Sequence, residues 1–280
     1  MFSISKTQYM QGRQCKKLLW LAVNNPDVLE KEENIRTTEG DEVGALARTY
    51  FSDAVTVPLR RAREMAEETA KLINDGRKVI CEATFAANGL TCSADIIRIE
   101  GKSVDIIEVK SSTSVKLRQL EDVSFQYHVI SSALKEFGLS VRNVFLMHPN
   151  GDYVRGEELD IYEYFKLERV TDFVHEAAVG VEDNIADFTA LCKEDEPTMP
   201  LAMHCESPYE CPAKAYCHKL HHIPEKSVFS MAGMTAKKKY DLYANGIVTP
   251  RDMLLATGAL TERQLIQAKA LASGIEGKEM

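Results

Sequence analysis

The stretch that decides the fold is residues 77–112, RKVICEATFAANGLTCSADIIRIEGKSVDIIEVKSS. It holds three short segments rich in valine, isoleucine and other apolar residues, a composition typical of β-strands. Asn88-Gly89 separates the first two segments and Glu100-Gly101 the last two, and both pairs are short hairpin signals. The stretch therefore predicts three adjacent antiparallel strands.

Charged residues recur in these strands at positions that share one face. Two-residue turns at the two hairpin sites would place Glu82 opposite Asp95 and Asp95 opposite Ile106. Because side chains alternate between the faces of a strand, Glu108 and Lys110 then lie on the face of Ile106. The predicted register makes Asp95 and Glu108 diagonal neighbours, roughly 7–8 Å apart at the backbone.

Three carboxylates on one face repel one another, and a divalent cation would relieve that repulsion. Mg²⁺ held by such carboxylates can activate water, and Lys110 adds a compact positive charge beside it. The alternative is an exposed, solvated strand face. It fits less well because apolar residues occupy both faces of these strands. These apolar residues are Ile96, Ile97, Ile99, Ile106, Ile107 and Val109.

The flanking sequence adds helices and a further strand. The hydrophobic spacing predicts helices over 4–22, 38–51, 60–75, 116–137 and 161–191, a strand within 141–148, and short helices in the last fifty residues. The order of the elements predicts an α/β fold whose central mixed sheet is flanked by helices.

Composition is that of an ordinary globular protein, with 280 residues and 45% hydrophobic content. Neither a membrane span nor a secretion signal is evident, so the sequence predicts a cytoplasmic protein without a membrane partner. The net charge of −8 is uneven, because residues 151–200 alone carry 14 acidic and 4 basic side chains. A nucleic-acid footprint would therefore have to be local.

Asp95 followed by Glu108-Val109-Lys110 resembles the core motif of the PD-(D/E)XK nucleases. ADIIRI and DIIEVKSS are similar to the form found in RecB-like exonucleases, including CRISPR-associated ones. The resemblance implies a restriction-endonuclease-like core and a Mg²⁺- or Mn²⁺-dependent exonuclease that prefers single-stranded DNA ends. It also implies a site residue set: Asp95, Glu108, Lys110 and Gln126 as catalytic, and Asp95, Glu108 and the Val109 carbonyl as metal ligands, to which the hairpin register adds Glu82.

Two further family motifs are present only in part. The helix after the ExK strand has Gln126 at the first position of Gln-x-x-x-Tyr, but Ile130 replaces the tyrosine. Gly40 fits an early Gly-x-x-x-His, but Gly44 replaces the histidine, which makes Glu42 a substitute metal ligand. Gln126 could be a surface amide, but its place on the helix directly after the catalytic strand favours a role in the site. Glu42 could equally be an acid that stabilises the first turn of its helix.

Cys205, Cys211 and Cys217 are spaced by five residues in a proline-containing segment, a spacing that fits structural zinc sites poorly. Soft thiolates suit zinc or an iron–sulfur cluster, and unligated thiols are the third possibility. The arrangement is similar to iron–sulfur members of the RecB-like group. That resemblance implies a structural 4Fe–4S cluster held by these three residues and Cys15. It covers residues 1–220, nearly the whole of the predicted nuclease domain, which is residues 1–222.

Residues 223–280 are predicted to be a small helical appendage. Gly246 and Thr249-Pro250 faintly resemble the turn of a helix-hairpin-helix, which offers backbone amides to DNA phosphates. A packing appendage with a solvated lysine run is the competing interpretation. Predicted contacts to the DNA backbone are Lys16, Lys17, Lys237, Lys238 and Lys239.

The leading functional prediction is a metal-dependent deoxyribonuclease, most simply an exonuclease. A structure-selective endonuclease is a second possibility, because the same core supports several substrate forms. A non-catalytic DNA-binding or assembly factor is the third, favoured by the missing histidine and tyrosine and opposed by the intact Asp95, Glu108 and Lys110.

Overall fold

The computed structural model describes residues 4–30, 37–256 and 258–273. The chain divides into two compact units, of which the first comprises Met1–Arg13 and Glu33–Asp195 and the second Gln14–Glu32 and Glu196–Met280. The predicted boundary between a nuclease domain, residues 1–222, and a helical appendage, residues 223–280, stays a prediction. No helix in the described ranges is both long and apolar enough to cross a membrane.

Seven strands in the described part of the first unit form one mixed sheet, in the order β2-β3-β4-β5-β6-β7, with β1 paired to β4. The strands are β1 (Ile4–Ser5), β2 (Val55–Thr56), β3 (Val79–Ala87), β4 (Leu90–Glu100), β5 (Ser103–Val109), β6 (Ser140–Pro149) and β7 (Phe165–Arg169). The β3–β4, β4–β5 and β6–β7 pairs are antiparallel and the others are parallel. The predicted α/β fold with a central mixed sheet is confirmed.

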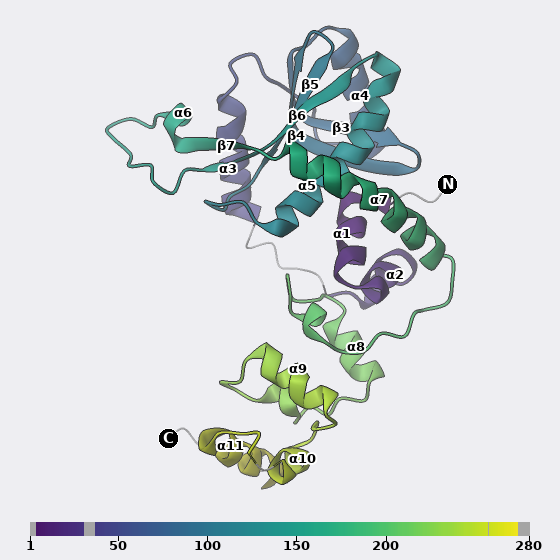
Figure 1. Ribbon diagram of the computed structural model, residues 1–280, viewed down its shortest axis with the longest axis vertical. Coiled ribbons are helices and arrows are strands. Elements are labelled where there is room, and N and C mark those ends of the chain that lie inside the picture. Colours follow the sequence, from purple (N-terminus) through teal and green to yellow (C-terminus); the bar gives the residue numbers. More distant parts are fainter. Residues whose placement is uncertain (1–3, 31–36, 257, 274–280) are drawn as a thin grey trace. The chain divides into compact units, whose positions relative to one another are not determined.

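Helices cover both faces of this sheet (Figure 1). The helical segments are α1 (Lys6–Gln14), α3 (Thr37–Thr49), α4 (Ala62–Asn74), α5 (Leu117–Ala133), the 3-10 helix η2 (Leu134–Phe137), α6 (Ile161–Tyr164) and α7 (Thr171–Leu191). Helix α3 packs Ala47 against Cys81, Ile96 and Ile107. Helix α5 packs on β3, β4 and β6, and α7 packs on α5.

The first predicted hairpin is confirmed, because Ala87 pairs with Leu90 across Asn88-Gly89. The second turn was placed one residue too early. Glu100 pairs with Ser103, so the turn residues are Gly101 and Lys102. Gly101 has a φ of 60°, which glycine adopts without steric cost.

The shift moves the β4–β5 register by two residues, and each side chain therefore keeps its predicted face. Ile96 pairs with Ile107, and continuing that register by one residue sets Asp95 directly opposite Glu108. The predicted pairing of Asp95 with Ile106 was wrong, because Ile106 pairs with Ile97. Asp95 and Glu108 are thus direct neighbours across the ladder rather than diagonal ones.

Two predicted helices are interrupted. The first, over residues 4–22, begins as β1 and breaks at Cys15, whose backbone is extended with φ −159° and ψ 125°. The second, over residues 161–191, contains β7, because Phe165–Arg169 pairs with the outer edge of β6. Both interruptions come from strand pairing or packing with distant residues, which the helical spacing of a segment does not encode.

The second unit is helical. Its helical segments are α2 (Lys16–Asn24), η1 (Pro26–Val28), η3 (Met203–Cys205), α8 (Lys214–Leu220), η4 (Val228–Ser230), α9 (Ala236–Ala244), α10 (Pro250–Leu255) and α11 (Glu262–Ser273). The predicted start of α10 is confirmed, since Thr249 caps it and Pro250 is its first residue. Met231, Leu242, Met253 and Leu260 belong to a core formed by the C-terminal helices.

Candidate active site

Asp95 and Glu108 form a carboxylate pair on neighbouring strands at the centre of the sheet. Their positions share a face with Ile97 and Ile106, which are fully buried. The backbone N–H of Val109 donates to Asp95 Oδ2 at 2.6 Å, which fixes this carboxylate against β5. No group in the described part of the chain donates to the other Asp95 oxygen.

Two lysines and a second aspartate surround Glu108 in an alternating ring of charges. Lys110 Nζ lies 2.8 Å from Glu108 Oε1 and 2.7 Å from Asp122 Oδ2. Lys6 Nζ lies 3.1 Å from Glu108 Oε1 and 3.2 Å from Asp122 Oδ1. We call these four residues the charge ring: Lys6, Glu108, Lys110 and Asp122. Its two ammonium groups formally balance its two carboxylates, which leaves Asp95 outside that balance.

Gln126 is fully buried on α5 and holds the other side of Glu108. Its amide Nε2 donates to Glu108 Oε2 at 2.7 Å and to the Ser93 carbonyl at 3.2 Å. Its Oε1 is also buried and accepts no hydrogen bond from the described residues. Because the amide is fully buried and bonded to Glu108, it lies beside the carboxylate pair and is not a group of the helix surface.

Burial and charge act in opposite directions on the two central carboxyls. Burial, and then the charge of Glu108, raise the pKa of Asp95. Burial also disfavours ionisation of Glu108, but the charges of Lys110 and Lys6 outweigh it and lower the pKa of Glu108. Glu108 therefore ionises readily, whereas Asp95 resists ionisation. A cation bound beside Asp95 would favour its ionised form.

A cavity of about 400 Å³ opens beside this pair, between α3 and the strands. Its lining includes Glu82, Asp95, Val109 and Lys110 from the predicted site. Glu82 has a φ of 56°, and its carboxylate is 3.0 Å from Arg48 Nη1 of α3. This positive φ coincides with a gap in the ladder, where no Glu82–Asp95 pair forms although the flanking pairs keep the register.

Helix α3 brings Asp41 and Arg48 to the cavity instead of Glu42, the ligand that the sequence suggested. Gly40, Asp41, Gly44 and Arg48 line it, following one side of the helix. Glu42 is exposed and does not line the cavity. Asp41 is therefore the acid that α3 brings to the site.

The donor chemistry of the cavity fits a hard divalent cation. Asp95 has an oxygen without a donor, and Glu108 is its direct neighbour. Carboxylate and carbonyl oxygens are the ligands that Mg²⁺ prefers. In the described side-chain conformations, however, no three His, Cys, Asp or Glu residues are arranged to hold a metal ion. Glu82 and Glu108 are held by cations of the chain instead.

Sequence reasoning missed Lys6, Asp122 and Arg48. Asp122 had a usable signal, because it lies one helical turn before Gln126 and so shares its face of α5. Lys6 had none, because only the pairing of β1 with β4 brings it to the site. Arg48 lies on the same side of α3 as Gly40 and Gly44. The sequence did not indicate that this side faces the strands, so Arg48 could not be assigned to the site from sequence alone.

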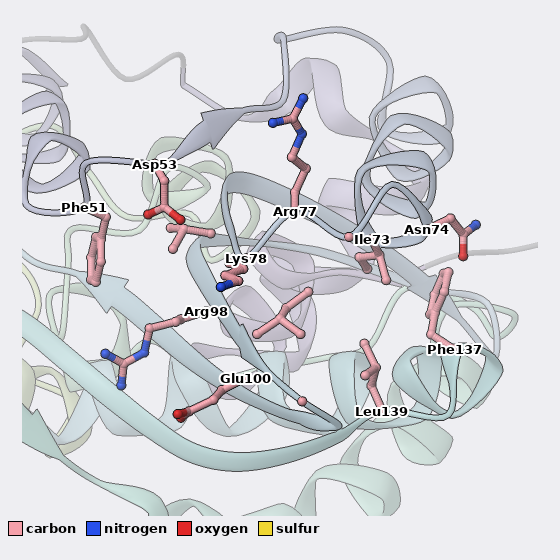
Figure 2. Close-up of a pocket in the computed structure, with 14 residues that line it drawn as sticks. Phe51, Asp53, Ile73, Asn74, Arg77, Lys78, Arg98, Glu100, Phe137 and Leu139 are labelled. Atoms are coloured by element: carbon pink, nitrogen blue, oxygen red, sulfur yellow. The ribbon is translucent and has the colours of Figure 1, made fainter.

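A larger cavity of about 760 Å³ lies at the Glu100 end of β4 and shares no lining residue with the cavity of the site. Figure 2 shows Phe137, Leu139 and Ile73 grouped on one side of it, with Arg98 and Glu100 on another. None of the carboxylates of the candidate site lines it. The chemistry of the lining, rather than cavity size, therefore locates the candidate active site.

The four predicted cluster cysteines share one core in the second unit. Cys15, Cys205 and Cys211 are buried there, and Cys217 packs against them. No disulfide joins any of the seven cysteines, which all lie in the described part of the chain. Burial first, and then charges on the three neighbouring cysteines, raise the pKa of Cys211 to about 12. The four thiols are neighbours, although they are not arranged to hold a metal in the described conformations.

The lysines predicted to contact DNA differ in their exposure. Lys17 is buried and lies 2.8 Å from Glu196, so its ammonium is not presented to a DNA backbone, whereas Lys16 is exposed. Lys237 is exposed and pairs with Asp241. The ammonium groups of the other two bond within the protein: Lys238 to Gln264 and Lys239 to the Phe229 carbonyl.

Neither a family model nor a curated protein matches this sequence. Among solved structures, the chain is similar to the crystal structure of an alkaline exonuclease (LHK-Exo) from Laribacter hongkongensis. The alignment covers 68% of this chain and 90% of that chain, with 10% sequence identity and a TM-score of 0.28. A likeness at this TM-score carries no argument about function, which depends instead on the side chains of the site.

Proposed function

We propose that this protein is a metal-dependent nuclease that hydrolyses phosphodiester bonds in DNA. The observation that carries the proposal is the position of Asp95 opposite Glu108, in the register of the neighbouring Ile96–Ile107 pair, together with Lys110 directly after the end of β5. Asp95 and Lys110 line a cavity between α3 and the sheet, and Glu108 contacts Lys110 beside it, so a phosphate group has room to enter there. The spacing of the three residues also resembles the PD-(D/E)XK motif.

The roles of the residues follow from their contacts. Asp95, Glu108 and the Val109 carbonyl would hold Mg²⁺ or Mn²⁺, with Glu82 as a further ligand once it leaves Arg48. Such an ion activates water and stabilises the charge that develops on a phosphodiester during hydrolysis. Lys110 supplies a positive charge toward the water or the phosphate. Gln126 orients Glu108 through a 2.7 Å hydrogen bond.

Formal charge favours an anionic substrate at this cavity only when a metal is bound. The charge ring sums to zero and Arg48 balances Glu82, so Asp95 and Asp41 leave a net charge of −2. A divalent cation would bring that sum to zero, which removes the repulsion that a phosphate group would otherwise meet. The charges therefore suit a substrate that binds only after the metal.

The finer substrate assignment rests on the sequence resemblance. It favours an exonuclease that begins at single-stranded ends, with Lys16 and Lys237 as the exposed lysines for backbone contacts. The test compares end-labelled linear and circular single strands with duplex DNA, in Mg²⁺ and in Mn²⁺. Cleavage of linear strands alone supports an exonuclease, and cleavage of circles indicates an endonuclease. Binding without cleavage on every substrate and in both metals would contradict the nuclease proposal and favour a DNA-binding factor.

We also propose that Cys15, Cys205, Cys211 and Cys217 hold a structural 4Fe–4S cluster, in a protein of the cytoplasm. The supporting observation is that the four thiols belong to one apolar core, although Cys15 is distant from the others in sequence. Metal binding would deprotonate the ligand thiols, against burial, which raises the pKa of Cys205, Cys211 and Cys217. Anaerobic purification should yield brown protein with about four iron and four sulfide per chain. One zinc per chain without iron would reject the cluster.

A further inference from the structure

Lys6 reaches the active site from the first residues that the structure describes. It is the first residue of α1, directly after β1, where Ile4 and Ser5 pair with Leu90 and Thr91 of β4. Asp95 lies on that same strand. The pairing anchors the backbone beside the site, and the Lys6 side chain extends to Glu108 and Asp122.

The charge ring needs a second cation. Only 4% of the Glu108 side chain and 14% of the Asp122 side chain is exposed. Lys110 contacts both carboxylates, and without Lys6 it would be the one ammonium of the ring left to balance them. A buried carboxylate without a partner is costly, so both carboxylates would then hold Lys110 more strongly.

We propose that Lys6 is a positioning residue of the active site, which shares Glu108 and Asp122 with Lys110 and so weakens the hold of both carboxylates on the Lys110 ammonium. This inference rests on the proposed nuclease function and adds a residue to its site. Lys6 also repels a cation bound at Glu108, because its ammonium lies 3.1 Å from that carboxylate. Lys6 thus lowers the metal affinity of the site and lets Lys110 leave the two carboxylates more easily when substrate binds.

The position of Lys6 favours this role over a purely structural ion pair. Its side chain is 29% exposed, and each of its partners keeps the Lys110 ammonium when Lys6 is removed, which limits the cost to folding stability. Its two partners, in contrast, are the carboxylates that also bind Lys110. Removal of Lys6 should therefore change the electrostatics of the site more than the stability of the fold.

The test measures Mn²⁺ binding by calorimetry, and cleavage of end-labelled single strands, for the wild type and for Lys6→Met. Even in water, a like charge about 6 Å from a divalent cation weakens its binding roughly tenfold. Lys6→Met should therefore bind Mn²⁺ about tenfold more tightly. The kcat of this variant should fall at least about tenfold, because both carboxylates then hold Lys110 more strongly than in the wild type. Its KM should change little.

Two further variants separate charge from structure. Lys6→Arg keeps the charge and should restore most of the kcat and the weaker Mn²⁺ affinity. Lys71→Met removes an exposed lysine of α4, 66% exposed and distant from the ring, and should leave both quantities unchanged.

The outcomes separate this proposal from the function on which it rests. A Lys6→Met protein with unchanged Mn²⁺ affinity, or with weaker affinity, would overturn the role of Lys6 even if kcat fell. A wild-type protein that binds Mn²⁺ without cleaving DNA would contradict the nuclease function. The Mn²⁺ affinity of Lys6→Met, compared with that of the wild type, would still test the role of Lys6. A wild type that binds no Mn²⁺ would overturn both.

Discussion

At the scale of single residues, we expect substitutions at the two carboxylates and at Lys110 to have different effects. The carboxylates are Asp95 and Glu108. Asp95→Asn and Glu108→Gln each keep an oxygen but lose the charge that holds a hard cation, so cleavage should fall below detection. Lys110→Met should lower kcat by about 100- to 1000-fold, the usual effect of removing one charge-stabilising group, and still bind Mn²⁺. Single-turnover cleavage and calorimetry measure the two quantities.

The control for these variants is Glu64→Gln, an exposed acid of α4 that should leave cleavage and Mn²⁺ binding unchanged. Without metal, Asp95→Asn should unfold at a higher temperature than the wild type, because it removes one of two facing carboxylates. Cleavage that survives Asp95→Asn would move the active site to other residues.

At the scale of secondary-structure elements, Asp105 connects three central strands. This fully buried residue of β5 accepts hydrogen bonds from Arg98 of β4 at 2.7 Å and from Arg142 of β6 at 2.8 Å. Asp105→Asn should destabilise the fold by about 3 kcal/mol, because it leaves part of a buried ion pair unmatched. Urea unfolding at pH 7 measures this free energy.

The matched control is Glu100→Gln, since Glu100 bonds the same Arg142 but is 72% exposed. It should cost about 1 kcal/mol or less. The arginines lower the pKa of Asp105 to about 2, against burial, which raises it. The Asp105 contribution is therefore complete above the ordinary pKa near 4 and is lost as the pH falls toward 2. Equal costs for the two variants would show that burial does not matter here.

At the scale of the whole molecule, the second unit joins two segments that are distant in sequence, Gln14–Glu32 and Glu196–Met280. A cluster bound by Cys15 and Cys211 would link them and close a very long loop. Cys211→Ala should therefore lose iron and lower the unfolding midpoint by about 10 °C, the shift expected from about 3 kcal/mol in a chain of this size. Iron analysis and calorimetry measure the two effects.

The control is Cys192→Ala, because Cys192 is a buried cysteine of the first unit. The Cys192→Ala protein should keep the full iron content of the wild type. If Cys211→Ala retains a full complement of iron, Cys211 is not a ligand.

The sequence by itself determined the three-stranded meander and the face on which Asp95, Glu108 and Lys110 lie. Alternation along a strand is a local property, and an error in the turn that preserves the parity of the register leaves every face unchanged. Only the tertiary structure decided that Asp95 stands directly opposite Glu108, that β7 interrupts a predicted helix, and that Lys6 completes the charge ring. These features depend on pairing between distant segments, which local spacing does not specify.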